Sequence, residues 1–362
     1  MENAILVGTH ALDELRELAV SAGARIIGEV IQRRDRPDPA TFIGKGKVEE
    51  LREEVLVEGV DLVIFDDELS PSQAKNLQEA LDTKVVDRTG LILDIFARRA
   101  RTKEGKLQVE LAQLEYRLTR LAGYSEYLSR LGGGIGTRGP GETKLEMDRR
   151  QIRHRISTLK RDTEQIRKHR QLHRQHRRRD QLPLVSLVGY TNAGKSTLFR
   201  ALSKENTLVS SRLFSTLDTL IRRIQLRQNL PILISDTVGF IRKLPHQLVS
   251  AFRATLEEVV ESDLILHVLD ASDPDREEKR EVVLKVLEEL GAENHPMLTV
   301  LNKIDLVPDL AAGFGDRHRI SGGQEIQCLS PNPAEIFVSA VTGAGLDNLV
   351  DAVFHQVSPV RV

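Results

Sequence analysis

The chain has 362 residues, of which 40% are hydrophobic and 29% are charged, and it contains one cysteine, Cys328, and no tryptophan. This length suffices for two or three domains with hydrophobic cores. The single cysteine excludes an intramolecular disulfide and a four-cysteine zinc site, and no apolar run approaches the length of a membrane span. Residues 1–20 lack a signal-peptide pattern, so the sequence favours a cytoplasmic protein.

The net charge of −1 conceals a strongly basic segment. From Arg149 to Arg179 the chain holds eleven Arg and two Lys against one Asp and one Glu, together with four of its ten His. Such a block predicts a polyanionic partner, and nucleic acid is the first candidate. The alternative is a solvated basic helix that binds nothing. A positive field this concentrated favours the first interpretation.

Residues 1–102 are predicted to form a small α/β domain. Short apolar runs indicate four strands: "AILV" (Ala4–Val7), "RIIGEVI" (Arg25–Ile31), "DLVIFD" (Asp61–Asp66) and "TKVV" (Thr83–Val86). Helical patterns alternate with these runs. This alternation predicts a mainly parallel sheet that is covered by helices on both faces.

Local signals mark two helices in this domain. The apolar positions of the first helix share one stripe: Leu12, Leu15, Leu18, Ala19 and Ala22. Gly23 suits its C-terminal end, and a later helix begins with Ser70 as N-cap and Pro71 at the first helical position. "GKGK" (Gly44–Lys47) lacks the spacing of a phosphate-binding loop and is interpreted as a basic turn. No catalytic constellation is visible, so a docking module is predicted.

Residues 103–180 show helical periodicity with one interruption. The first arm carries leucine at heptad spacing in two rows: Leu107, Leu114 and Leu121, with Leu111 and Leu118. The second arm repeats the spacing with Leu145, Ile152, Leu159 and Ile166. Two such stripes flanking a short loop predict an antiparallel helical hairpin with these residues in its core. Both stripes can be satisfied within one hairpin, so the heptads leave the oligomeric state open; a monomer is expected.

The loop between the arms, "LGGGIGTRGPG" (Leu131–Gly141), contains six glycines in eleven residues. Glycine lets another backbone approach closely and leaves amide groups free to meet phosphate. A flexible turn is the alternative, but a helical hairpin needs fewer residues to turn. The sequence therefore favours an RNA-contacting tip with Arg138 as the charged contact. The glycines of this tip are Gly132, Gly133, Gly134, Gly136, Gly139 and Gly141.

The segment 181–362 begins with a phosphate-binding motif. "LPLVSLVGYTNAGKST" is an apolar strand followed by Gly189, four residues, Gly194, Lys195 and Ser196, and then a helical pattern. In this order the backbone amides wrap the phosphates, Lys195 reaches the β- and γ-phosphates, and Ser196 Oγ binds Mg²⁺. The residues predicted to contact the nucleotide here are Gly189, Tyr190, Thr191, Asn192, Ala193, Gly194, Lys195, Ser196 and Thr197.

A second motif, "DTVG" (Asp236, Thr237, Val238, Gly239), ends the apolar strand "PILIS". This position places Asp236 near the metal and the Gly239 amide near the γ-phosphate. The preceding segment "QLRQNLPILISD" predicts an antiparallel hairpin, as in the mixed sheet of a Ras-like domain.

Two further motifs point to guanine. "NKID" (Asn302, Lys303, Ile304, Asp305) ends the apolar run "MLTVL", and Asp305 can accept two hydrogen bonds from the guanine edge, a donor pair that adenine lacks. Asn302 would brace the loops, the Lys303 stem would cover the base, and Ser339-Ala340 would offer an amide to guanine O6. Four motifs in this order predict a Ras-like P-loop domain that binds GTP or GDP.

Between the first two motifs, "RLFSTLDTLIRR" offers a threonine that completes Mg²⁺ coordination when the γ-phosphate is present. From the residues alone, Thr216 and Thr219 are equal candidates.

Four segments together resemble the HflX GTPases: "GYTNAGKSTLF", "LFSTLD", "DTVGFIRKLPHQLVSAFRATLEE" and "GGGIGTRGPGETKLEMDRR". The resemblance covers nearly the whole chain. It implies a GTP-hydrolysing factor that docks on the large (50S) ribosomal subunit and its 23S rRNA and separates stalled ribosomes. It gives the metal-sensing role to Thr216, within the nucleotide-contacting residues Phe214, Ser215, Thr216, Leu217 and Asp218. The implied catalytic residues are Lys195, Thr216 and Gly239, and the implied metal ligands are Ser196, Thr216 and Asp236.

Phe240 follows "DTVG" where many switch GTPases carry a glutamine that orients the attacking water. Phenylalanine cannot make that hydrogen bond, so stabilisation must come from Mg²⁺, Lys195, backbone groups and a further source. One candidate is K⁺ held by Asn192, as in potassium-activated GTPases, although Asn192 can equally serve only to hydrogen-bond the loop. The other candidate is the ribosome, which predicts slow intrinsic hydrolysis and stimulation by the large subunit.

Two other functions remain open. One is an RNA-binding or anti-association factor in which GTP only stabilises the bound conformation. The other is an Era- or Obg-like assembly GTPase, which shares the G domain but does not need the Gly-rich hairpin.

Overall fold

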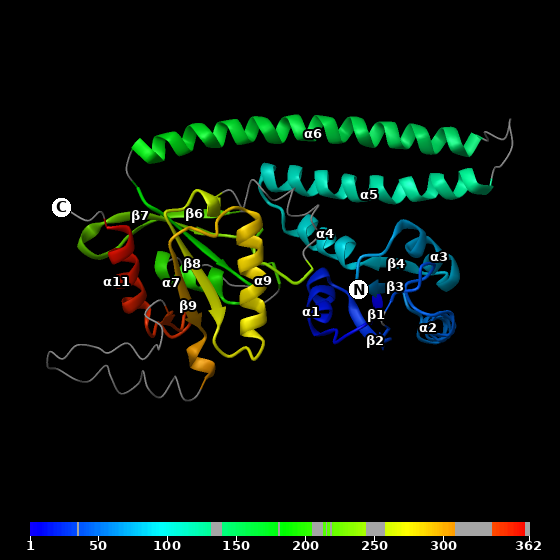
Figure 1. Ribbon diagram of the computed structural model, residues 1–362, viewed down its shortest axis with the longest axis horizontal. Helices are drawn as coiled ribbons and strands as arrows, with labels where there is room; N and C mark the ends of the chain where they lie inside the picture. The colour runs from blue at the N-terminus through cyan, green and yellow to red at the C-terminus, as the bar shows by residue number, and fades with distance from the viewer. Residues whose placement is uncertain are drawn as a thin grey trace. The chain divides into compact units, whose positions relative to one another are not determined.

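The computed structural model divides the chain into two compact units, Met1–Arg167 and the described residues from Lys168 onward (Figure 1). The structure describes residues 1–34, 36–131, 140–179, 182–204, 213–214, 216–217, 219–243, 258–307 and 335–358. Within these ranges, side chains are described except at 122–131, 140–145, 167 and 169–179. None of the described helices has the length and apolar character that a bilayer span requires.

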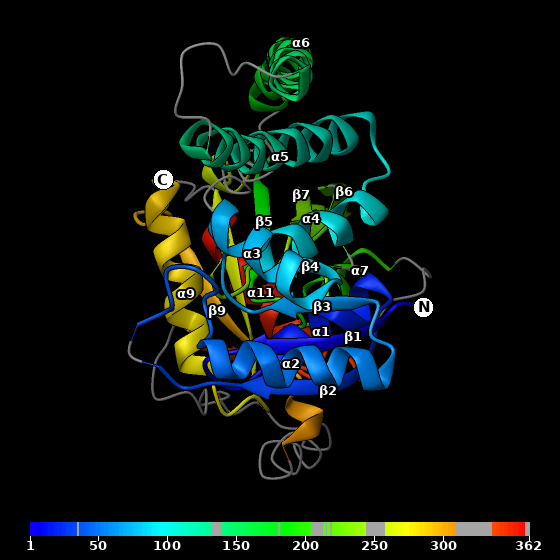
Figure 2. The ribbon, with the colours of Figure 1, turned by 90° about the vertical axis from the view of Figure 1, so that its right-hand side faces the viewer.

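The first unit contains a four-stranded sheet with strand order β2-β1-β3-β4, and every pairing in it is parallel. Its strands are β1 (Asn3–Gly8), β2 (Arg25–Ile31), β3 (Leu62–Phe65) and β4 (Lys84–Asp87). They confirm the four predicted strands to within one residue at each end. Helices α2 (Lys45–Glu58) and α3 (Pro71–Leu81) cover one face, and α1 (Asp13–Ala22) and α4 (Arg88–Arg99) cover the other (Figure 2).

The ends of the helices in this unit lie where local sequence signals predict them, with one exception. Ser70 Oγ accepts the Gln73 N–H at 3.2 Å and the Gln73 side chain accepts the Ser70 N–H at 3.0 Å, which completes a capping box for α3. Gly23 ends α1 in the left-handed conformation, with φ 85°. The interpretation of "GKGK" as a turn is wrong, because α2 begins at Lys45. The buried stripe Val48, Leu51 and Val55 stabilises the helix despite its glycine.

Asp87, at the end of β4, joins the sheet to helix α5 (Lys103–Leu131). Its carboxylate is fully buried and accepts hydrogen bonds from Tyr116 Oη and Arg120 Nη2, both at 2.6 Å. The N–H groups of Leu69 and Gly90 donate to it at 3.1 and 2.9 Å. Four donors compensate the loss of hydration of this charge, so α5 is fixed to the edge of the sheet.

Helix α5 packs against α6 (Pro140–Arg179) through the leucine stripes. Leu111, Ile156 and Leu159 are buried at this contact, and Leu107, Leu114, Leu118 and Ile152 pack around them. Ion pairs flank it, Glu110 with Arg155 at 2.7 Å and Glu115 with Lys160 at 2.8 Å.

The predicted loop 131–141 is shorter than expected at both ends. Leu131 closes α5, and Pro140 and Gly141 lie in the first turn of α6, where proline at the start of a helix is favourable. Residues 132–139, with Arg138 and the glycines Gly132, Gly133, Gly134, Gly136 and Gly139, lie outside the described residues.

The second unit contains a six-stranded sheet in the order β10-β9-β8-β5-β7-β6. Its strands are β5 (Leu184–Gly189), β6 (Leu220–Gln225), β7 (Pro231–Asp236), β8 (Leu264–Asp270), β9 (Met297–Asn302) and β10 (Glu335–Phe337). All pairings are parallel except β6 with β7, which confirms the predicted antiparallel hairpin; the short helix η1 (Arg227–Asn229) connects the two strands.

Among the described residues, three helices cover this second sheet. Helices α7 (Lys195–Ser203) and α11 (Leu346–Val357) pack on one face through Leu198, Phe199, Leu349 and Val353, and α9 (Arg276–Glu289) packs on the other (Figure 1). The result is a mixed α/β sheet whose parallel strands end together at one edge, where the candidate site lies.

His267 is a buried polar residue in the middle of this sheet. It lies on β8 between Val188 of β5 and Thr299 of β9. Neither of its ring nitrogens has a hydrogen-bond partner within the described part of the chain. Burial, together with the charges of Arg280 and Lys195, lowers the pKa of His267 from 6.5 to about 4.

We expect His267 to make the second unit acid-sensitive. The imidazole of His267 takes up a proton near pH 6.5 in the unfolded chain and only near pH 4 in the folded chain. The contribution of neutral His267 to the unfolding free energy is therefore complete above pH 6.5 and is lost as the pH falls toward 4. The unfolding free energy lost in this way approaches about 3 kcal/mol. His267→Leu should flatten this part of the pH dependence of the unfolding free energy, measured with urea between about pH 7.5 and 4.5. An equal slope in the variant would contradict the assignment.

Candidate functional site

The predicted phosphate loop begins where β5 ends and leads into the first turn of α7. Lys195 Nζ donates to the carbonyl oxygens of Gly189 at 3.0 Å and Tyr190 at 2.7 Å. Gly194 has φ 88°, and a Cβ there would lie 2.2 Å from Asn302 Nδ2. Only glycine fits this position. Asn302 Nδ2 in turn donates to the Ala193 carbonyl at 3.0 Å, so the loop is held from the neighbouring strand end.

Lys195 carries a buried positive charge. Its side chain is 6% exposed, and burial lowers its pKa from 10.5 to about 8, although Asp236 acts in the opposite direction. The two carbonyl groups supply only partial charge. A phosphate beside Nζ would supply the missing counter-charge, as the sequence motif predicts.

Ser196, Thr216 and Asp236 converge beside Lys195, although they come from three separate segments. Ser196 Oγ and Thr216 Oγ1 lie 2.8 Å apart, and Thr216 Oγ1 donates to Asp236 Oδ2 at 2.8 Å. Asp236 is 1% exposed, and its Oδ1 is buried without a hydrogen-bond partner among the described residues. Burial raises the pKa of Asp236, against the influence of Ser196, Lys195 and Thr216.

This oxygen set fits a hard divalent cation. Mg²⁺ typically takes one or two carboxylates and completes its shell with phosphate oxygens and water, and a cation here would satisfy the buried Asp236 Oδ1. Across the described ranges, no group of three or more His, Cys, Asp or Glu could hold a metal. Such a cation would therefore depend on one carboxylate, two hydroxyls and the nucleotide.

The two candidate threonines have different surroundings. Thr216 belongs to the cluster just described, whereas Thr219 Oγ1 is buried with no hydrogen-bond partner in the described part of the chain. Among the neighbouring predicted contacts, Phe214 and Leu217 are buried, and Phe214 has φ 53°. Ser215 and Asp218 lie outside the described residues.

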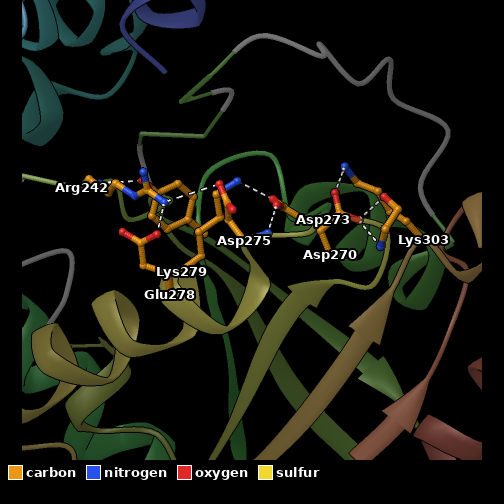
Figure 3. A network of polar contacts seen from close by, with 9 residues as sticks. Arg242, Asp270, Asp273, Asp275, Glu278, Lys279 and Lys303 are labelled. Carbon is orange, nitrogen blue, oxygen red and sulfur yellow. Dashed lines mark hydrogen bonds and ion pairs between the residues drawn. The ribbon is translucent and has the colours of Figure 1, made fainter. Parts of the chain in front are cut away.

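The four residues of "NKID" lie at the end of β9 and the start of the short helix η2 (Ile304–Leu306). Asp305 Oδ1 accepts a hydrogen bond from Ser339 Oγ at 2.5 Å, and Asn302 Oδ1 accepts the Ala340 N–H at 3.0 Å. Lys303 Nζ lies 2.7 Å from Asp270 Oδ2, and Figure 3 draws these two side chains facing each other. Ile304 is buried and anchors the turn.

These contacts bring both predicted guanine motifs together at the carboxyl edge of the sheet. The main-chain amides predicted to face guanine O6 are bonded within the protein, since Ser339 N donates to the Ala344 carbonyl at 2.9 Å and Ala340 N donates to Asn302. Asp270 was missed in the sequence, although an acidic residue at the end of a parallel strand is a recognisable signal.

The segment after β7 lies directly on the phosphate loop. A Cβ at Gly239 would lie 2.9 Å from Thr191 Cα and 3.0 Å from Lys195 Nζ, so glycine is required. Thr237 Oγ1 donates to the Leu187 carbonyl at 2.6 Å, and Val238 is buried. Phe240 is 1% exposed, so its ring packs in the interior.

Two predicted nucleotide contacts are more open. Asn192 is exposed and has a left-handed backbone, with φ 65°, and Thr197 is half-buried in the first turns of α7. The position of Asn192 is compatible with a cation ligand and with a purely local role.

A phosphate loop between strand and helix, a hydroxyl and carboxylate cluster beside its lysine, and an aspartate at the guanine position define a P-loop GTPase. Three family models match the chain: GTP-binding GTPase N-terminal over residues 9–97, GTP-binding GTPase Middle Region over 99–177 and 50S ribosome-binding GTPase over 184–303. The chain belongs to the HflX GTPase family, whose members include relatives 52% and 46% identical to it.

The first of these relatives is GTPase HflX of Caldanaerobacter subterraneus subsp. tengcongensis, where the alignment covers 98% of this chain and 80% of the relative. The second is GTPase HflX of Escherichia coli (strain K12), with 96% of this chain and 79% of the relative covered. Among solved structures, the complex of SsGBP and GDP has a TM-score of 0.53 and 25% identity, and the match covers 100% of both chains. The protein is therefore a GTPase that binds GTP and GDP.

We expect nucleotide binding to take up a proton above about pH 8. The pKa of Lys195 is about 8 in the free protein, and phosphate oxygens beside Nζ should raise it. The dissociation constant for GDP should therefore increase as the pH rises from about 8 to 9, by up to about tenfold per unit. Calorimetric titration in buffers of different protonation enthalpy would count the protons.

Lys195→Met is the matched control for this experiment. It should bind GDP more weakly and show only the pH dependence that belongs to the nucleotide itself. Equal proton uptake by the wild type and the variant at pH 8.5 would rule out Lys195 as its source.

Proposed function

We propose that this protein is a ribosome-stimulated GTPase that docks on the 50S subunit and splits stalled ribosomes, with GTP hydrolysis timing its release. The observation that carries the proposal is Phe240, a buried apolar residue where a water-orienting glutamine would stand, in a chain whose G domain matches the 50S ribosome-binding GTPase model. A site that lacks this side chain depends on an activator to order its switches.

In this proposal Ser196, Thr216 and Asp236 would hold Mg²⁺, which would supply positive charge to the phosphates. Lys195 would act on the γ-phosphate by its charge, Gly239 by its main-chain amide and Thr216 through the cation that it helps to hold. The short distances among the three metal-binding oxygens support this assignment. Asn192 would add K⁺ as a second source of positive charge.

We further propose three domains, residues 1–102, 103–180 and 181–362, which the ranges of the three matched family models support. The middle domain would be an antiparallel helical hairpin with a Gly-rich tip that contacts 23S rRNA. The described part of α6 supports an RNA-facing role because Arg150, Arg153 and Arg161 are exposed on it. The protein would act as a cytoplasmic, ribosome-associated monomer.

The first test is GTP turnover by the purified protein, alone and with 50S subunits, in KCl and in NaCl. We expect slow turnover alone and an increase on the order of tenfold or more with 50S subunits, because the subunit orders the switches. Stimulation by K⁺ alone would assign the missing charge to Asn192. If the nucleotide-free protein splits ribosomes as well as the GTP-bound form, the anti-association function is correct and the timing role is not.

The second test concerns the charge of α6. Replacing Arg150, Arg153 and Arg161 by Gln should weaken 50S binding and lower the salt dependence of log K by about 2, since each phosphate contact contributes about 0.7 to 0.9. Basal turnover should be unchanged. The matched control replaces the same residues by Lys, which keeps the charge and should keep most of the binding. Unaltered binding of the Gln variant, measured by sedimentation with 50S subunits, would remove α6 from the interface.

A further inference from the structure

Phe240 leaves only main-chain groups to act at the position after Gly239. Its N–H donates to the Gly189 carbonyl at 3.1 Å, and its carbonyl accepts the Thr191 N–H at 2.7 Å. These bonds accompany a parallel bridge between Tyr190 and Phe240. Main-chain groups contribute to a reaction only when the segment that carries them is held in place. The residues that hold the backbone after Gly239 in place therefore affect the rate of GTP hydrolysis.

Tyr190 lies between Gly189 and Thr191, the two phosphate-loop residues that bond Phe240. Its side chain contacts the backbone two residues further on, at Arg242. Its side chain is 5% exposed, and its Oη accepts the Arg242 N–H at 2.7 Å. Its main-chain carbonyl also accepts the hydrogen bond from Lys195 Nζ. One residue thus contacts both the phosphate-binding lysine and the backbone that follows Gly239.

Helix α9 holds the same two residues through charged side chains. Lys279 Nζ lies 5.5 Å from the centroid of the Tyr190 ring and pairs with Asp273. Arg242 Nη2 lies 2.7 Å from Glu278 Oε2, and a longer contact reaches Asp275 at the start of the helix. Figure 3 shows Arg242 directed toward these two carboxylates, with the Lys279 and Asp273 pair beside them.

We propose that Tyr190 is a positioning residue for GTP hydrolysis, whose hydroxyl holds the Gly239–Arg242 backbone against the phosphate loop. Tyr190 acts through that backbone, which presents the Gly239 amide to the γ-phosphate. The proposal goes beyond the ribosomal function, because it concerns hydrolysis by the protein alone.

Two of the contacts of Arg242, with Tyr190 and with Glu278, differ in burial and therefore in their response to salt. The bond from Arg242 N to Tyr190 Oη is buried on the tyrosine side and neutral, so dissolved ions screen it little. The ion pair joins side chains that are 36% exposed at Arg242 and 61% exposed at Glu278. Such a pair is weak, and added salt weakens it further.

Tyr190→Phe tests the proposal, since it removes one hydroxyl and keeps the ring with its Lys279 contact. We expect basal kcat to fall about fivefold, the effect of one lost neutral hydrogen bond in the transition state, while KM for GTP and Kd for GDP stay within about twofold. The loss should persist when tetramethylammonium chloride is added at fixed KCl. Arg242→Ala keeps the main-chain N–H that Tyr190 accepts and removes only the exposed ion pair with Glu278. Its loss of kcat should therefore be smaller, and it should disappear at high salt because salt weakens this pair in the wild type as well.

Tyr116→Phe is the matched control, because it removes a bonded hydroxyl from a tyrosine of the first unit and should leave basal kcat unchanged. The proposal is overturned by a wild-type or higher kcat in Tyr190→Phe. It is also overturned if KM and the Kd for GDP rise while kcat is retained, which would assign the hydroxyl to nucleotide binding. A loss of kcat that matches the unfolded fraction at the assay temperature, read by circular dichroism, would assign it to stability alone.

Discussion

The buried charges of Lys195 and Asp236 constrain the whole second unit. One is 6% exposed and the other 1%, and burial disfavours the charged form of each, lowering the pKa of the lysine and raising that of the carboxyl group. Protein dipoles only partly replace water around them, since Lys195 contacts two carbonyl groups and Asp236 Oδ1 has no hydrogen-bond partner among the described residues. A phosphate chain with a divalent cation supplies charge of the opposite sign to both groups at once. The site is therefore complementary to a phosphate chain bound together with a cation, as the proposed function requires.

Phe240 shows how the same site can lack a polar side chain and keep its geometry. Its ring adds buried apolar surface at the carboxyl edge of the sheet, and its main chain pairs with Gly189 and Thr191. A glutamine there would need a hydrogen-bond partner if it were buried, so the apolar residue suits a main chain held close to the phosphate loop. Orientation of the reacting groups then depends on backbone position, and backbone position depends on Tyr190 and on α9.

Much of this architecture was predictable because it rests on local rules. Most strands of both sheets are short apolar runs, and Ser70 and Gly23 mark helix ends by local chemistry. The start of α2 was missed because burial of Val48 and its neighbours outweighs the glycines of "GKGK". Contacts between distant segments were also beyond the sequence: nothing local says that Tyr190 accepts a hydrogen bond from Arg242, or that Thr216 and not Thr219 meets Asp236.

Helix α6 belongs to both units, because the boundary between them falls within it. It belongs to the first unit as far as Arg167 and continues to Arg179, and β5, which carries the phosphate loop at its end, begins at Leu184. At its other end the helix packs on α5, which Asp87 fixes to the first sheet through Tyr116 and Arg120. Only residues 180–183 separate the end of α6 from β5 in the chain, so the two units are joined directly before the strand that ends in the phosphate loop.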